Sequence, residues 1–343
     1  MGDLKSLTKE NVIEKMLKSG TWPLIRQRPY SVIADPADEP KAIIISAFDS
    51  SPLAPDMSYL IDGLGNEFQA GIDAMNKLTS GKIHLNLREG NMAATIFSSA
   101  TGVQLNYFKG PHPAGNVGVQ IYHLDPINKG DIVWYLDPQA VVTIGKLFLE
   151  GKYDASRRIA LVGSEVDKPQ YFKVISGCNI FPLVKDSRLS TNIRYISGNV
   201  FTGQPIEKDG YLGFYDRQLT LIPEGNYHEF LGWAMPRLNK FSFSKSFFSW
   251  LTPNKKYSLD TNINGGHRAF VFTGEYEKVF PMNIYPMQLL KAIMVKDIDL
   301  MENLGIYEVD EEDFALCEFI DSSKTEMQAI VREGLDYLRK ELS

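Results

Sequence analysis

Strand-like and helix-like segments alternate through residues 41–163, and this alternation limits the fold more than any other feature. Lys41–Ala47 is a continuous apolar run, typical of a strand buried in a parallel sheet. Asp137-Pro138 predicts a helix start, with Asp as the cap and Pro in the first turn. The pattern predicts a doubly wound, mostly parallel sheet with its ligand site at the carboxyl edge. Further strands are expected at residues 82–87, 103–108, 132–136 and 158–163.

The pattern changes after about residue 165. Short strand-like runs between glycines predict a small mixed sheet, and helical periodicity returns from Pro286. We therefore predict α/β plus α+β architecture in three parts: an α/β domain over 1–165, a small sheet domain over 166–250, and a connecting segment with a helical domain over 251–343. The aromatic-rich stretch Trp233–Phe272 is expected to pack between domains rather than to form a binding surface.

The first loop, Ser19–Tyr30, lacks the residues that bind a phosphate. In a nucleotide- or flavin-binding α/β domain this loop would be glycine-rich, so that bare backbone amides could approach the phosphate. Here Trp22, Pro23, Leu24 and Ile25 fill the loop. The sequence therefore indicates the architecture of a redox enzyme without cofactor-binding chemistry.

Composition excludes several classes of protein. The net charge of −6 offers no basic footprint for nucleic acid. Cys178 and Cys317 lie far apart, so neither a disulfide framework nor a zinc or iron–sulfur site is supported, and the histidines lack metal-ligand spacing. No apolar run approaches the ~20 residues of a membrane helix, and the N-terminus does not resemble a signal peptide. We expect a soluble chain in a reducing compartment.

His112 lies between two prolines in the unusual loop Lys109–Gly118. A rigid turn leading into a helix is favoured over a ligand-binding loop. A hydrolase that uses His112 is a further alternative, but no GxSxG nucleophile motif is present and no partner carboxylate can be assigned from the sequence.

A run of acids, Glu308–Asp313, precedes the last helical segments. Negative charge is stabilised at the start of a helix, so we expect a solvated helix N-terminus, with a cation site as the alternative.

Several long motifs are spread over essentially the whole chain: Gly20-Thr21-Trp22 with Arg28-Pro29, Phe108–Gly115, Gly145–Leu149, Ile196-Ser197-Gly198, Gly232–Pro236 and Asp310–Asp313. Together they resemble the NqrA family, which supplies one subunit of the bacterial sodium-translocating NADH:quinone oxidoreductase. That family usually carries a further N-terminal barrel-sandwich domain, similar to a biotinyl/lipoyl carrier, so the chain looks like a fragment that starts after it.

The resemblance implies a Rossmann-like domain related to the flavin domain of respiratory complex I, a β-grasp domain of the SLBB (soluble-ligand-binding β-grasp) type, and a degenerate helical iron–sulfur domain. Two departures matter. The relatives' glycine-rich flavin loop corresponds to Gly20–Tyr30, where the glycines are missing, and their cysteine ligands would fall near Tyr307–Ser323, where only Cys317 remains. One thiolate cannot hold a cluster that needs four. The resemblance therefore implies a redox subunit that has lost both cofactors.

The implied function is that of a peripheral subunit on the cytoplasmic side of the bacterial inner membrane, without a transmembrane segment. It would support ubiquinone reduction to ubiquinol coupled to sodium export, with no catalytic residue, metal or cofactor of its own. NADH, FAD, FMN, iron–sulfur clusters and ubiquinone would belong to the complex. The implied partners are the other subunits, above all the membrane subunit NqrB, with quinone as a further candidate and no nucleic acid.

Six residues are candidates for contact with quinone or a partner, because aromatic rings stack on a quinone head and Arg can donate to its carbonyl oxygens. We expect Arg26, Arg28 and Tyr30 on an exposed loop at the carboxyl edge of the sheet. The alternative is that both arginines pair with acids of a partner subunit and that Trp22 is core. An autonomous flavin- or NADH-dependent oxidoreductase is a second hypothesis, favoured by the α/β alternation and opposed by the missing glycines and cysteines. The six candidates are Trp22, Arg26, Arg28, Pro29, Tyr30 and His112.

Overall fold

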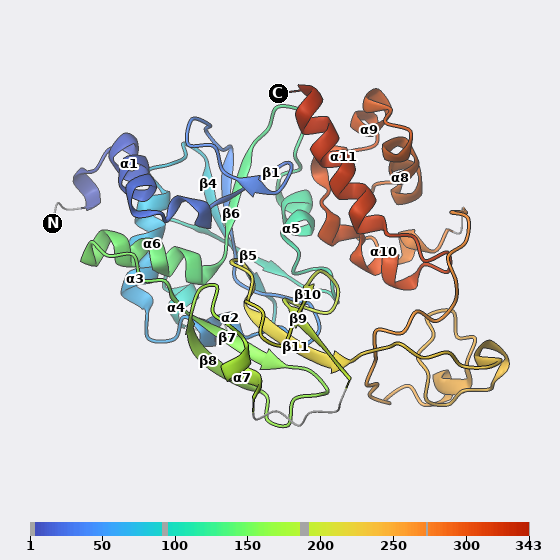
Figure 1. Cartoon of the computed structure of the whole chain (residues 1–343). Coiled ribbons are helices and arrows are strands. Elements are labelled where there is room, and N and C mark those ends of the chain that lie inside the picture. Colours follow the sequence, from blue (N-terminus) through green and yellow to red (C-terminus); the bar gives the residue numbers. More distant parts are fainter. Residues whose placement is uncertain (1–3, 91–94, 186–191, 272–273, 343) are drawn as a thin grey trace.

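The computed structural model describes residues 4–90, 95–185, 192–271 and 274–342. Two β-sheets lie side by side, and helices from the C-terminal part pack beside the first sheet (Figure 1). The first sheet has the strand order β2-β1-β6-β3-β4-β5, and the second has the order β10-β9-β11-β7-β8.

Four parallel strands form one side of the first sheet, and they confirm four of the strands expected in the α/β region. They are β3 (Ala42–Ser46), β4 (Lys82–Arg88), β5 (Gln104–Phe108) and β6 (Val133–Leu136). Two short antiparallel strands, β1 (Arg26–Arg28) and β2 (Val32–Ile33), extend the sheet beside β6. The segment expected as a loop is therefore partly strand. Its three-residue strand Arg-Gln-Arg carries no apolar run that would have indicated a strand.

The first sheet is a middle layer with a core on each face, because successive side chains of a strand point to opposite sides. Ile43, Ile45 and Trp134 belong to a cluster shared with helices α1 (Lys9–Ser19), α3 (Gly65–Met75) and α6 (Pro138–Glu150). Ile44 and Tyr135 belong to a second cluster, on the opposite face.

Helix α6 begins as predicted, because the Asp137 side chain accepts a hydrogen bond from the Ala140 amide at 2.8 Å. It ends at Gly151, whose left-handed φ of 73° suits glycine. Helix α6 packs closely on α3. A Cβ at Gly145 would lie 1.7 Å from the carbonyl oxygen of Glu67, so only glycine permits this approach.

The C-terminal helices cover the second face of the first sheet together with α5 (Val117–Leu124). The apolar stripe of α11 is buried as predicted, from Met327 to Leu338. The core of these helices includes Ile44 and Val133 of the first sheet, so the C-terminal segment completes the α/β layers and has no separate core. The four helices are α8 (Pro286–Met294), α9 (Ile298–Asn303), α10 (Ala315–Ile320) and α11 (Met327–Leu342).

The second sheet is mixed, as expected, with β7 and β11 parallel and the other pairs antiparallel. Strand β7, expected in the first sheet, belongs to the second, so the change of sheet falls before Ser156 and not near residue 165. An apolar run predicts a strand but not the sheet that receives it. Tyr211–Phe214, expected as a strand, forms only a bridge between Asn179 and Tyr211. The strands are β7 (Ser156–Val162), β8 (Gln170–Ile175), β9 (Ile193–Ser197), β10 (Gln204–Ile206) and β11 (Gln218–Pro223).

Most of the aromatic-rich stretch does not pack between the domains. It projects from the body of the molecule (Figure 1, orange), and Phe243, Phe248 and Trp250 are exposed. Two rings do pack on the C-terminal part: the ring centroid of Phe241 lies 5.9 Å from that of Phe319, and Phe270 packs against the second core cluster. The expected packing layer is therefore wrong for most of the described residues, which exclude Phe272. Across the described chain, no helix combines the length and apolar character needed to cross a membrane. The remaining elements are short: α2 (Met57–Leu60), α4 (Thr95–Ser98), α7 (Phe181–Val184), and 3-10 turns at Leu4–Ser6, Trp22–Leu24, Gly232–Ala234, Phe248–Leu251, Tyr276–Lys278, Ile306–Glu308 and Glu311–Phe314.

Candidate functional site: a cleft at the carboxyl edge of the first sheet

A cleft of about 1010 Å³ lies where the two sheets and the C-terminal helices meet. Ser46 and Leu136 line it from the carboxyl ends of β3 and β6, which is where open parallel sheets place their ligands. The second sheet contributes the loops around Phe201 and Tyr215, and the C-terminal part contributes Arg332. All three parts of the chain therefore build the cleft.

Strand β1 places Arg26 in this cleft. Because β1 pairs with β6, Arg26 lies opposite Tyr135, and its guanidinium is 5.4 Å from the centre of that ring. The Tyr215 ring lies 4.9 Å away, and Arg26 Nη2 donates to the carbonyl of Ser31 at 2.8 Å. Tyr215 in turn donates from its hydroxyl to the carbonyl of Pro23 at 2.8 Å, which fastens the second sheet to this edge. Arg26 is thus a cation held between two aromatic rings at the margin of an open cleft.

Arg28, two residues along the same strand, is buried and does not line the cleft. Its Nη2 lies 3.0 Å from Asp310 and 2.7 Å from Glu312. Ser31 also donates from its hydroxyl to Asp310. The sequence analysis allowed that Arg28 pairs with acids of a partner subunit. It pairs instead with acids of its own chain, and we call this cluster of Arg28, Ser31, Asp310 and Glu312 the joint.

The joint shows that the acidic run is not a solvated helix start. Asp310 is 4% and Asp313 1% exposed, and Asp313 accepts a hydrogen bond from the Asp310 amide at 3.0 Å. Burial raises the pKa of Asp310, but the Arg28 guanidinium together with the hydrogen bonds from Glu311 and Ser31 outweighs burial and lowers this pKa to about 2. Burial and the negative charge of Glu312 raise the pKa of Asp313 to about 8. The acidic run therefore holds, in one buried cluster, one carboxyl whose pKa is lowered and one whose pKa is raised.

The remaining candidates of the first loop are structural. Trp22 is 3% exposed, donates from its indole N–H to the carbonyl of Ala34 at 2.7 Å, and packs edge-on against Trp134. The alternative that Trp22 is core is therefore confirmed. Pro29 is buried, and Tyr30 is half-buried. The Tyr30 carbonyl accepts a hydrogen bond from Arg332 at 2.9 Å, so this segment ties β1 to α11. The expected exposed loop is absent here because its residues form β1 and its contacts.

His112 lies in the cleft at the end of the turn that leads into α5, so the predicted turn before a helix is confirmed. Its Nδ1 is 3.0 Å from Ser50 Oγ, and that oxygen accepts a hydrogen bond from the Gly115 amide at 2.8 Å. The His112 ring stacks on Phe201, with centroids 5.2 Å apart. Burial lowers the pKa of His112, which favours the neutral ring.

The contacts of Ser50 assign the tautomer of that ring. Ser50 Oγ accepts a hydrogen bond from the Gly115 amide, and among the described contacts His112 Nδ1 is the acceptor available to its own proton, which favours donation from Ser50 to His112. The ring proton then lies on Nε2, which has no hydrogen-bond partner among the described residues. No sequence pattern joins Ser50 to His112, 62 positions apart, so the sequence could not have identified this pair.

The second sheet adds cationic residues that the sequence analysis missed. Arg217 lies 3.5 Å from Asp49 and 3.3 Å from Asp137. Asp137 thus caps α6 with one oxygen and binds Arg217 with the other. Arg157 also lines the cleft, and it donates to the carbonyl of Phe214. The cleft combines guanidinium groups, carboxylates and aromatic rings, a lining suited to a planar group that accepts hydrogen bonds.

The groups that would hold a flavin or a cluster are not arranged for it. Trp22 and Pro23 form a 3-10 turn at the place of the relatives' glycine-rich loop, with the Trp22 ring in the core. Cys317 is buried among the C-terminal helices, and burial raises the pKa of its thiol. Within the described residues, no group of three or more His, Cys, Asp or Glu side chains is placed to hold a metal ion.

Comparison with known proteins agrees with the motif-based resemblance. Residues 7–153 match the family model described as "NqrA second alpha/beta domain", and residues 158–208 match the model described as "NQRA C-terminal domain". A chain of an NAD+-reducing [NiFe]-hydrogenase in the H2-reduced state aligns with a TM-score of 0.45 and 12% identity over 98% of this chain and 64% of that chain, too distant a likeness to carry an argument.

Curated relatives match over nearly the whole chain. The A subunit (NqrA) of the Na(+)-translocating NADH-quinone reductase of Hahella chejuensis is 37% identical, over 99% of this chain and 76% of the relative. The corresponding protein of Rhodopirellula baltica is 37% identical, over 98% of this chain and 74% of the relative. The protein of Neisseria meningitidis is 36% identical, over 98% of this chain and 75% of the relative. The chain therefore belongs to the NqrA family of the Na+-translocating NADH-quinone reductase.

Proposed function

We propose that the chain works as the NqrA subunit of a Na+-translocating NADH-quinone reductase. It would support the reduction of ubiquinone to ubiquinol coupled to sodium export, and it would carry no redox cofactor itself. The observation that carries this proposal is 37% identity to a curated NqrA relative over 99% of the chain. The test is to assemble the complex with and without this chain. NADH-driven quinone reduction should require the chain, and unchanged activity without it would refute the proposal.

The finer assignments of the family are part of the same proposal. They place the chain as a peripheral subunit on the cytoplasmic side of the inner membrane, in contact with the membrane subunit NqrB. They also assign the first sheet to a Rossmann-like domain and the second to a β-grasp domain of the SLBB type. Cross-linking within the assembled complex tests the contact, because an NqrB partner would yield peptides that join these two proteins.

The proposed lack of a cofactor rests on the first loop and on Cys317. Pro23 has no amide proton to donate to a phosphate, the Trp22 ring is fixed in the core, and the Cys317 thiol is buried. An autonomous oxidoreductase would need free backbone amides in the first loop or several accessible cysteine ligands. The chain purified with ample riboflavin and iron should be colourless and should not oxidise NADH. A stoichiometric flavin or cluster would revive the autonomous oxidoreductase.

We place the proposed quinone or partner contact in the cleft, with Arg26 and His112 as its residues. Both line the cleft, whereas Trp22, Arg28, Pro29 and Tyr30 do not. A guanidinium and a ring N–H can each donate to a quinone carbonyl.

The test is binding of a water-soluble ubiquinone analogue, followed by calorimetry. Arg26→Ala and His112→Ala should each weaken binding about tenfold, the loss of one charge-assisted or neutral hydrogen bond. The exposed Arg88, outside the cleft, serves as the matched control as Arg88→Ala. Equal affinity of all three variants would place the contact elsewhere.

A further inference from the structure

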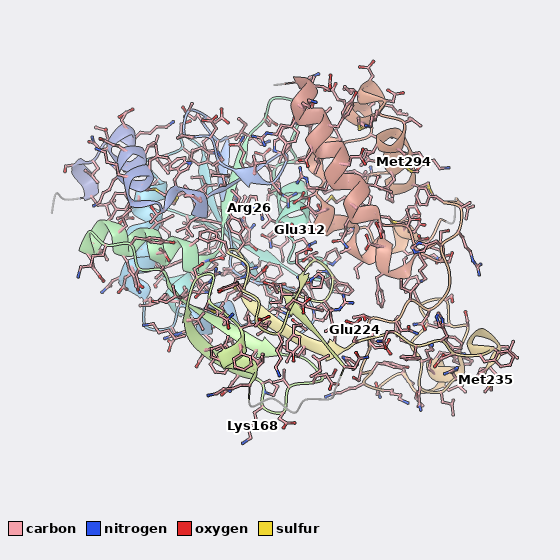
Figure 2. The ribbon with its side chains drawn as sticks, in the orientation of Figure 1. Arg26, Lys168, Glu224, Met235, Met294 and Glu312 are labelled. Carbon is pink, nitrogen blue, oxygen red and sulfur yellow. The ribbon has the colours of Figure 1, made fainter. Side chains whose placement is uncertain are left out.

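Residues 228–259 form a long excursion that we call the arm. Its base is closed by two contacts: Tyr227 donates to Asp260 at 2.6 Å, and Thr261 donates to Glu224 at 2.5 Å. Between these contacts the chain forms only two short 3-10 turns, Gly232–Ala234 and Phe248–Leu251. Figure 1 shows the arm projecting from the body, and Figure 2 labels Met235 at its far end. The arm is thus a closed loop with very little regular structure.

The arm exposes large apolar side chains. Phe230 is 92% exposed, and Met235, Phe248, Trp250 and Leu251 are each more than half exposed. None of the described residues of the arm belongs to the three buried apolar clusters of the molecule. Such a concentration of exposed aromatic and aliphatic side chains marks a surface that something else covers.

The arm is also basic in an acidic chain. It contains five Lys and Arg against one Asp or Glu, a net charge of +4, whereas the whole chain carries −6. The acid, Glu229, is neutralised by Arg237 and Lys240, each at 2.8 Å. Lys245, Lys255 and Lys256 are exposed, and none of them forms an ion pair with another described residue. Unpaired positive charge therefore lies beside the apolar side chains.

We infer that the arm docks on an anionic phospholipid surface, with its aromatic side chains at the headgroup level and its lysines on the lipid phosphates. Trp and Phe beside Lys is the composition of segments that lie in a membrane interface. Basic residues add attraction to anionic headgroups that falls with salt. The inference concerns residues that do not line the cleft, and its test needs neither quinone nor the other subunits.

The lysines favour lipid over a protein partner. Protein interfaces are depleted in Lys at their core, because an ammonium group loses its hydration there. On a bilayer the same group stays hydrated among phosphates while its neighbours reach the acyl boundary. A surface with the unpaired cations Lys245, Lys255 and Lys256 beside Phe248 and Trp250 fits the second setting.

The experiment is sedimentation of the full chain with vesicles. Vesicles of equal parts phosphatidylglycerol and phosphatidylcholine should bind the chain at low salt, and vesicles of phosphatidylcholine alone should bind it much less. Charge reversal in the arm (K245E, K255E and K256E together) should weaken binding by at least about tenfold. The matched control reverses three exposed lysines near the second sheet, Lys152, Lys168 and Lys173, and should change affinity less than about twofold.

Fluorescence gives a second readout that does not depend on charge. Trp22 and Trp134 are buried and Trp250 is 52% exposed, so lipids with brominated acyl chains should quench Trp250 and leave the two buried rings unquenched. Trp250→Phe should remove that quenching while the chain stays folded. The inference is overturned if neutral vesicles bind equally well, if arm and control reversals have equal effects, or if binding appears only on vesicles that carry the membrane subunits, which would identify a protein partner.

Discussion

The joint and the arm differ in how far their charged and aromatic side chains are exposed to solvent. In the joint, Arg28 and the carboxylate of Asp310 are almost fully buried and form an ion pair within the chain. In the arm, Lys245, Phe248 and Trp250 are all exposed. Charged residues expected at the surface lie inside, and aromatic residues expected inside lie at the surface.

The difference teaches that composition alone does not decide exposure. The acidic run is buried because β1 presents Arg28 to it across 284 positions of sequence, and buried charges persist only when they are paired. The arm is exposed because it contributes no side chain to any described core cluster. The joint is thus a fixed contact of the fold, and the arm is a surface available to an external partner.

Breaking the joint should have the largest effect. Arg28→Met removes the nearer of two cations from the buried carboxylate of Asp310 and leaves Arg332 at 3.7 Å, so we expect a loss of about 3–5 kcal/mol in the free energy of unfolding, measured by urea denaturation. The exposed pair of Lys9 and Glu39 supplies the control, and Lys9→Met should cost no more than about 1 kcal/mol. A loss equal to that of the control would show that the joint stabilises the fold no more than an exposed ion pair does.

The pH dependence of the free energy of unfolding tests the burial of the acidic run in a second way. Burial raises the pKa of Asp313 to about 8, so near pH 6 the folded chain keeps this proton and the unfolded chain has lost it. The folded state then binds more protons, and stability falls as pH rises between about 4 and 8, by up to about 1.4 kcal/mol per pH unit from this group. Asp313→Asn mimics the protonated form and should flatten that slope in urea titrations at several pH values. A slope identical to that of the unaltered chain would contradict the assignment.

The Ser50–His112 pair should contribute less. Ser50→Ala removes the partner of His112 Nδ1 and the acceptor of the Gly115 amide, so we expect a loss of about 1–2 kcal/mol in unfolding free energy. The NMR titration of His112 should also move, because the hydrogen bond that fixes its tautomer is gone. Ser98→Ala, in the short helix α4 away from the cleft, is the comparison variant. An unshifted His112 titration would mean that Ser50 does not fix the ring.

Changes in the arm should have the smallest effect on stability. Trp250→Ser removes a side chain that is 52% exposed, and we expect a change within about 0.5 kcal/mol in unfolding free energy. A loss of several kcal/mol would mean that the arm packs on the body in solution.

Much of the fold was predictable from local patterns. The apolar run at Lys41–Ala47 and the Asp137-Pro138 cap correspond to β3 and α6, because buried strands and helix starts leave signals within a few residues. The sheet membership of β7 and the strand Arg26–Arg28 were not predictable, since strand partners are chosen by tertiary packing.

The site was predictable only in part. Arg26 and His112 were candidates because their residue types and loop are unusual, and both line the cleft. Ser50 and Arg217 carry no such signal, and they reach the cleft only through contacts distant in sequence. The burial of Arg28 could not have been foreseen either, because its partner Glu312 lies at the other end of the chain.

Hydrogen exchange of the full chain, followed by mass spectrometry with and without vesicles, tests the contrast between the buried joint and the exposed arm most directly. Peptides that cover residues 26–31 and 310–313 should be protected in both conditions, because the joint is buried. Peptides from residues 228–259 should exchange rapidly in solution and gain protection when phosphatidylglycerol vesicles are added. Rapid exchange in the joint, or an arm whose exchange is unaffected by the vesicles, would contradict the account.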